Sequence, residues 1–217
     1  MDYETLDVLY RSRKTLLKLL AMRGYATQTY EKFGPIEIAA MAAADGGAGG
    51  AFRMDLERPA DYGPIVKCRV DYSMNRIKNR LSGYIGGLIE EGNDSAINPA
   101  TTELILIVLE PVIETFHIAS MTALASKSLH ISFFQADTIV NNPLEHVLVP
   151  KHEVLPHSEH AKFLADNKIK SKANLPLIKY HEDMIARIYA LVPGDIVKIT
   201  RPSPSAGEYI SYRVCVP

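Results

Sequence analysis

The chain has 217 residues, of which 47% are hydrophobic and 23% are charged, and its formal net charge at pH 7 is −1. This composition is that of an ordinary globular protein, and the near-neutral charge argues against a free-standing, strongly basic nucleic-acid binder. The two cysteines, Cys68 and Cys215, are too few for a disulfide framework, so we expect a reduced intracellular compartment. No signal peptide opens the chain and no apolar run approaches the roughly eighteen residues of a membrane span, so no membrane association is expected.

The first two thirds of the chain predict a mixed α/β domain. Residues 4–23 are expected to form an amphipathic helix, because leucines recur there at about 3.6-residue spacing. The run 103–109, ELILIVL, is continuously apolar and too short for a typical helix, so it predicts a central strand buried on both faces. Further strands are expected at 52–56, 64–70 and 129–134, and further helices at 36–44, 73–91 and 115–126. Alternation of strands and helices is typical of a mixed α/β module.

A break at Asn141, Asn142 and Pro143 divides the sequence, and we predict domains at 1–143 and 144–217. The second domain is expected to contain helices at 158–167 and 183–189. It ends in two strands, 195–201 and 208–216, which the Pro-rich segment 202–207 joins as a hairpin. The predicted fold class is therefore α+β, with a mixed α/β N-terminal domain and a small C-terminal domain around a mostly antiparallel sheet.

The last strand alternates with a period of two. Ile210, Tyr212 and Val214 point to one face, where we expect the core, and Tyr209 and Arg213 point to the other. Tyrosine and arginine are also residues that anchor protein interfaces. The residues alone leave both roles open for this hairpin.

The stretch KITRPSPSAGEYISYRV resembles the C-terminal signature of a known family, the shared fifth subunit of the eukaryotic nuclear DNA-directed RNA polymerases I, II and III, which has an archaeal counterpart. The positions that match this signature are Val197, Lys198, Ile199, Arg201, Ser203, Ser205, Ala206, Gly207, Tyr209, Tyr212 and Arg213. Weaker similarity extends over nearly the whole chain. Departures from the pattern, such as Ala190 where the family has glycine, indicate a divergent or viral member.

The resemblance implies a non-catalytic polymerase subunit that uses no cofactor, metal or small-molecule substrate. Its C-terminal assembly domain would anchor on the largest subunit and meet neighbouring subunits. Its N-terminal domain, restriction-endonuclease-like but inactive, would form part of a lower jaw with weak, non-specific contact to downstream duplex DNA. The implied location is the nucleus, or the virion or a cytoplasmic viral factory for a viral chain. The candidate interface residues are His146, Arg201, Tyr209, Tyr212 and Arg213.

Basic residues gather in the middle of the chain and form the candidate DNA-proximal set. They are Lys67, Arg69, Arg76, Lys78 and Arg80. Lysine and arginine neutralise phosphates without reading sequence, which fits non-specific contact with DNA. A solvated helix face and an acidic protein partner are the alternatives, and the second would make the chain an interaction adaptor outside transcription.

Enzyme chemistry has weaker support. A nuclease of the restriction-endonuclease type needs an acidic residue two positions before the lysine of its active-site strand, and Ile65 stands there before Lys67. A degenerate nuclease using Asp55 therefore remains only an alternative that rests on fold analogy. The histidines at 146, 152, 157 and 160 match no zinc-ligand spacing, so no metal site is expected.

Overall fold

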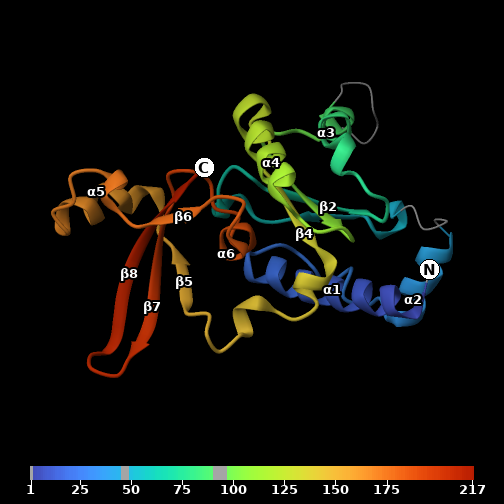
Figure 1. The fold of residues 1–217 in the computed structure, drawn as a ribbon, viewed down its shortest axis with the longest axis horizontal. Coiled ribbons are helices and arrows are strands. Elements are labelled where there is room, and N and C mark those ends of the chain that lie inside the picture. Colours follow the sequence, from blue (N-terminus) through green and yellow to red (C-terminus); the bar gives the residue numbers. More distant parts are fainter. Residues whose placement is uncertain (1, 45–48, 90–96) are drawn as a thin grey trace. The chain divides into compact units, whose positions relative to one another are not determined.

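The computed structural model of the chain describes residues 2–44, 49–89 and 97–217. It divides into two compact units, residues 1–142 and 143–217, and each has its own sheet. Figure 1 shows the helices and strands of both units in sequence colours.

The N-terminal unit contains a four-stranded sheet in the order β1-β2-β3-β4. Strand β1 (Met54–Glu57) is antiparallel to β2 (Lys67–Ser73), whereas β3 (Thr102–Val108) is parallel to both β2 and β4 (Ile131–Gln135). All seven residues of β3 are buried, which confirms the prediction of a central strand from the apolar run. Parallel pairing on both edges explains the continuous apolar sequence, because helices cover both faces of such a sheet.

Helices lie on both sides of this sheet in Figure 1. Helix α3 (Leu81–Ile89) and helix α4 (Glu114–Lys127) pack on one face, where their apolar residues share a core with β3 and β4. Helices α1 (Tyr3–Met22) and α2 (Pro35–Ala44) lie on the other side. The α1 helix begins at Asp2, whose Oδ1 accepts a hydrogen bond from the Thr5 N–H at 2.9 Å. This side-chain cap supplies one of the acceptors that the first turn of a helix lacks.

The prediction of one helix over 73–91 is wrong at its start. Strand β2 continues to Ser73, which pairs with Val108 of β3, and a 3-10 turn at Lys78–Arg80 precedes α3. Pairing with a distant strand decides the structure here and local periodicity does not. Residues 90 and 91 of the predicted helix lie outside the described residues.

The C-terminal unit contains the second sheet, in the order β5-β7-β8-β6. Strands β5 (Lys151–Val154), β7 (Ile196–Ser203) and β8 (Gly207–Val216) pair antiparallel, and only β6 (Leu177–Lys179) runs parallel to its neighbour. Helix α5 (His157–Asp166) contributes Phe163 to a core with Ile196 and Val214. A short helix, α6 (Met184–Ile188), precedes β7. The predicted α+β fold class with a mostly antiparallel second sheet is confirmed.

Candidate interaction surfaces

The β7–β8 hairpin is longer than the strands beside it. Strand β5 pairs only with Val197–Thr200, and β6 pairs only with Val214–Val216. The hairpin tip, residues 201–210, is therefore a two-stranded ribbon within the described structure, and Figure 1 shows it extending past β5. A two-stranded ribbon alone is only marginally stable in water, so burial against a partner would stabilise a tip of this kind.

Large side chains on both faces of the hairpin tip are exposed. Arg201 lies opposite Tyr209 in the register, so the two share a face, and Ile210 lies on the other face opposite Thr200. The side chains of Tyr209 and Ile210 are 59% and 46% exposed. The expectation that Ile210 belongs to the core is wrong, because the pairing of β5 ends at Thr200, the residue opposite Ile210, and β6 pairs with β8 only from Val214 onward.

Local hydrogen bonds set the shape of the turn at the end of the tip. The Ala206 N–H donates to Ser203 Oγ at 3.3 Å. Gly207 adopts a left-handed backbone with φ of +74°, which glycine does without steric strain. The serines, alanine and glycine of the signature motif therefore build the turn and leave Arg201 and Tyr209 available for contact.

The other predicted interface residues lie elsewhere. Tyr212 is half-buried against Phe163, with ring centroids 4.3 Å apart, so its ring belongs to the core of the C-terminal unit. Arg213 is partly exposed and its Nη1 donates to the Leu177 carbonyl at 3.1 Å, which ties β8 to β6. His146 is exposed in the segment before β5, where its Nδ1 accepts a hydrogen bond from the Leu148 N–H at 3.2 Å.

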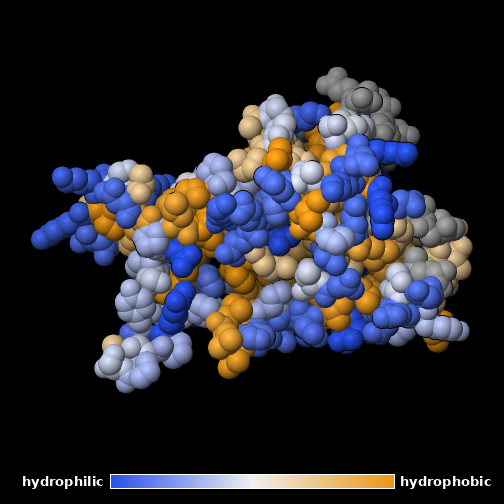
Figure 2. All heavy atoms as spheres, viewed as in Figure 1, coloured by the Kyte–Doolittle hydropathy of each residue, from blue (hydrophilic) through white to orange (hydrophobic). Residues whose placement is uncertain are grey.

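The same segment presents an apolar surface that lies outside the predicted interface residues. Val147 is 91% exposed and Leu148 is 81% exposed. In Figure 2 hydrophobic side chains stand out at the surface of the loop that precedes β5. The available signal was two adjacent apolar residues in a segment bounded by Pro143 and Pro150, without strand or helix periodicity.

The basic candidates divide into three groups. Arg69 is buried and its Nε donates to Asp71 Oδ2 at 2.9 Å, so it lies within the groove that Arg76 and Arg80 also line but its charge is paired there. Lys67 is exposed at the start of β2 and pairs with Glu57 at 3.3 Å. Its place on β2 separates it from the remaining cations, since a strand of this length spans roughly 20 Å.

The third group, Arg76, Lys78 and Arg80, is exposed in the connection between β2 and α3. Arg76 and Arg80 line one open groove of about 840 Å³, together with Arg53, which directly precedes β1. Glu110 fixes the backbone of this connection by accepting hydrogen bonds from the N–H groups of Ile77 at 2.7 Å and Lys78 at 3.1 Å. The arrangement holds several cations along a concave surface, which suits a phosphate backbone.

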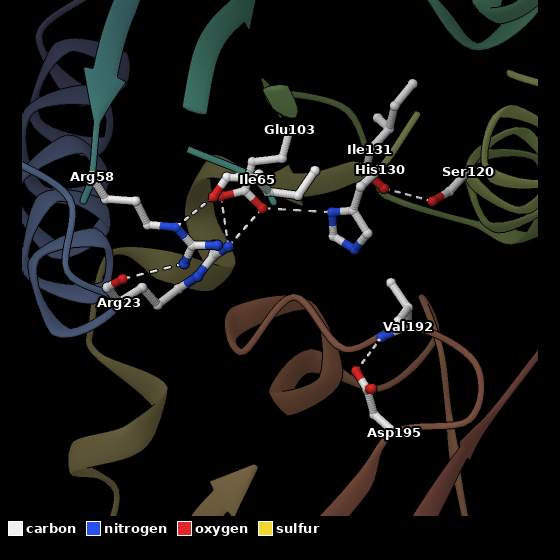
Figure 3. A network of polar contacts seen from close by, with 9 residues as sticks. All are labelled: Arg23, Arg58, Ile65, Glu103, Ser120, His130, Ile131, Val192 and Asp195. Atoms are coloured by element: carbon white, nitrogen blue, oxygen red, sulfur yellow. Dashed lines mark hydrogen bonds and ion pairs between the residues drawn. The ribbon is translucent and has the colours of Figure 1, made fainter. Parts of the chain in front are cut away.

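A buried ion pair holds the N-terminal unit together (Figure 3). Both carboxylate oxygens of Glu103 in β3 accept from Arg23 Nη2 at 2.6 Å, and His130 Nδ1 lies 3.6 Å from Oε2. Arg58 stacks on the Tyr25 ring and donates to the Arg23 carbonyl. Burial opposes ionisation of Glu103, but Arg23 and His130 outweigh it and hold the pKa of this carboxyl well below its usual range. The carboxylate is therefore a fixed structural anion and not a proton donor or acceptor near neutral pH.

The histidines of the C-terminal unit make polar contacts with neighbouring residues. His157 Nε2 lies 3.0 Å from Asp195 Oδ1, and its ring centroid lies 4.8 Å from that of His160. Lys172 Nζ donates to His160 Nδ1 at 2.8 Å, and burial is the largest of the effects that lower the pKa of His160. Within residues 2–44, 49–89 and 97–217, no group of three or more His, Cys, Asp or Glu side chains is placed to hold a metal ion, and no helix is long and apolar enough to cross a membrane.

Comparison with known proteins decides the family. The chain is 32% identical over 222 residues to the DNA-directed RNA polymerases I, II, and III subunit RPABC1 of Caenorhabditis elegans, and the match covers 96% of this chain and 95% of that protein. This chain belongs to the family of the fifth RNA polymerase subunit. The family model of the RNA polymerase Rpb5 C-terminal domain matches residues 141–215, which contain the hairpin tip and the segment before β5.

Two other fifth-subunit relatives match shorter parts of the chain. The DNA-directed RNA polymerases I, II, and III subunit rpabc1 of Dictyostelium discoideum is 41% identical over 90 residues, covering 42% of this chain and 45% of that protein. The DNA-directed RNA polymerase subunit Rpo5 of Staphylothermus marinus is 52% identical over 75 residues, covering 35% of this chain and 80% of that protein. The resemblance read from the signature motif is confirmed, for eukaryotic and archaeal members alike.

Proposed function

We propose that this chain is a non-catalytic subunit of a multisubunit DNA-directed RNA polymerase. The observation that carries the proposal is the similarity to a polymerase subunit of Caenorhabditis elegans over 96% of the chain, so that it includes both units. In this role the chain acts through its surfaces, and nucleotidyl transfer belongs to the large subunits. The eukaryotic relatives support a nuclear location. Their names give no support to the nuclease alternative.

The C-terminal unit is the anchor in this proposal, and the largest subunit is its partner. Support comes from the exposed side chains of the hairpin tip, because arginine and aromatic residues such as tyrosine carry much of the binding energy of protein interfaces. Arg201 and Tyr209 supply such side chains on one face of a ribbon that its own sheet does not cover, and Ile210 is exposed on the other face. His146, Val147 and Leu148 supply a second contact region, and Arg213 and Tyr212 act mainly by holding β8 in place.

The N-terminal unit faces downstream duplex DNA in this proposal. Arg76, Lys78 and Arg80 provide the contact, and Lys67 provides an additional cation at the far end of β2. These cations contact phosphates, and the proposal includes no side chains that read bases. The contact is therefore weak, non-specific and dependent on salt.

The proposal is tested by purifying the tagged full-length chain from its own cells and identifying bound proteins by mass spectrometry. We expect the large polymerase subunits to be recovered, and we expect deletion of residues 144–217 to abolish their recovery. The sharper variant is Tyr209→Ala combined with Ile210→Ser, which removes exposed apolar area without touching the core. Lys162→Ala on the exposed surface of α5 is the matched control and leaves recovery unchanged.

Two results would contradict this assignment. Purification of the intact chain without any polymerase subunit would remove the function itself. Equal recovery of the large subunits with the doubly substituted hairpin tip and with the control would leave the family membership standing but remove the tip as the anchor. Metal-dependent DNA cleavage lost in an Asp55→Ala variant would instead favour the nuclease.

A further inference from the structure

A pocket of about 370 Å³ lies in the N-terminal unit between helix α1 and the segment that leads into α2. Three aromatic side chains and three cations dominate its lining. The lining residues are Tyr10, Arg13, Lys14, Leu17, Lys18, Tyr30, Glu31 and Phe33. This volume and this mixture of rings with a few polar groups are those of a small-molecule site.

Arg13 is the unusual member of the lining. Its side chain is 3% exposed, and Nη1 donates to the Phe52 carbonyl at 2.9 Å. Nε and Nη2 have no hydrogen-bond partner, and no carboxylate of the described chain pairs with this guanidinium. Arginine stays charged in proteins, so a buried guanidinium with two idle donors is costly unless an anion meets it.

The rings of the pocket surround this charge. The guanidinium carbon of Arg13 lies 5.7 Å from the centroid of the Tyr30 ring and 5.8 Å from that of Phe33. Cation–π contact of this kind orients the guanidinium but leaves its N–H groups without acceptors. Both rings also line the pocket, which places the charge and the aromatic surface in the same hollow.

Neighbouring groups do not neutralise Arg13. Burial raises the pKa of the Tyr72 phenol to about 12, although Arg13 acts in the opposite direction, so the phenol is neutral near pH 7. Glu31 is an exposed lining residue whose Oε1 already accepts a hydrogen bond from Thr27 Oγ1. Lys14 and Lys18 add positive charge at the mouth.

We propose that this pocket binds a nucleoside phosphate. Nε and Nη2 of Arg13 are covered in the free chain and donate to the phosphate oxygens once the lining side chains shift, because a guanidinium presents parallel donors that match a phosphate, and Lys14 adds a second positive charge. The planar base lies against the rings of Tyr30 and Phe33. This inference goes beyond the polymerase role and does not depend on it, since every contributing residue belongs to the N-terminal unit.

The test is isothermal titration calorimetry of the full-length chain with ATP, inorganic phosphate and adenosine as separate probes. We expect ATP to bind at least about tenfold more tightly than either probe alone, because it uses both halves of the pocket. Phe33→Ala lowers the affinity for ATP and leaves the weaker affinity for phosphate unchanged. Lys14→Ala lowers the affinity for both.

Arg13→Gln removes the central donor and is expected to abolish binding, with circular dichroism confirming that the variant folds. Lys14 is exposed, so Lys14→Ala keeps the test valid if Arg13→Gln does not fold. The matched control is Lys32→Ala, which removes an exposed lysine beside Glu31 and Phe33 that does not line the pocket. Absence of ATP binding would overturn the proposal. So would a loss of ATP affinity in the Lys32→Ala control as large as that in Lys14→Ala, or equal affinities of the unsubstituted chain for ATP and for phosphate.

Discussion

Replacing Glu103 with glutamine tests which contact holds the N-terminal unit together. The side chain of Glu103 is 2% exposed and that of Arg23 is 9% exposed, so solvent cannot stabilise either charge. Glu103→Gln keeps the shape of the side chain but leaves the Arg23 guanidinium buried without its anion. Breaking one partner of such a pair costs about 3–5 kcal/mol, so we expect this loss in the free energy of unfolding. Urea denaturation followed by circular dichroism at pH 7 measures it.

The control is an ion pair of the same sheet that water surrounds. Glu57 and Lys67 are 3.3 Å apart with side chains 73% and 56% exposed, so Glu57→Gln is expected to cost less than about 1 kcal/mol. Adding Arg23→Met to Glu103→Gln removes the stranded charge and restores most of the lost stability. The reasoning is refuted if the Glu103 and Glu57 variants lose equal stability, or if the double variant is no more stable than Glu103→Gln alone.

The same pair predicts how stability depends on pH. Arg23 and His130 hold the pKa of Glu103 below its ordinary value of 4.5, despite the opposing effect of burial. A carboxyl whose folded pKa is depressed contributes stability above its unfolded pKa and loses that contribution as the pH falls. The difference between wild type and Glu103→Gln should therefore narrow below pH 4.5 by about 1.4 kcal/mol for each pH unit.

Three further predictions concern other parts of the chain. Ile196→Ala, in the core of the C-terminal unit, should cost about 2–5 kcal/mol in urea denaturation, whereas Ile210→Ala should change stability by less than about 0.5 kcal/mol; equal costs would contradict the assignment of Ile210 to the surface. Arg76→Ala should weaken duplex binding in fluorescence anisotropy and reduce the slope of log affinity against log salt by about one, and an unchanged slope would remove this residue from the contact. Burial raises the pKa of Cys68, and raises that of Cys215 to about 12, so both thiols should react with a thiol reagent at pH 8 far more slowly in the folded chain than in urea; rapid labelling of the folded chain would show that they are accessible.

Local sequence signals predicted the elements that local physics determines. The apolar run of β3 is such a signal, because all seven of its residues are buried. The period of two in β8 predicted the strand but not its burial, which increases from exposed residues at the tip to buried Val214 and Cys215. The helix predicted over 73–91 is wrong at its start, because the pairing of Ser73 with Val108 depends on a strand more than thirty residues away. Tertiary pairing outweighed a helical pattern that glycines had already weakened.

The surfaces were harder to predict than the fold. Ile210 and Tyr212 lie on the same face of the same strand, yet Ile210 is 46% exposed and Tyr212 packs on Phe163. Alternation gives the face of each residue but does not say how far the neighbouring strands extend. Arg69 shows the same limit, because only the position of Asp71 beside it turns a basic residue of a cluster into half of a buried pair. The sequence indicates which residue types are suited to an interface. The lengths of β5 and β6 determine which of those residues remain exposed on the hairpin.

Two arginines of the N-terminal unit show why burial alone does not identify a structural residue. Arg23 and Arg13 are both largely removed from water, but Arg23 meets both oxygens of Glu103, whereas Arg13 meets one carbonyl and two aromatic rings. Glu103→Gln leaves the buried charge of Arg23 without its anion, whereas Arg13→Gln removes a buried charge that no anion of the described residues pairs with. Arg13→Gln should therefore cost less stability than Glu103→Gln while it has the larger effect on ligand binding. An arginine that contributes little to stability and much to affinity is one whose donors are kept for a ligand.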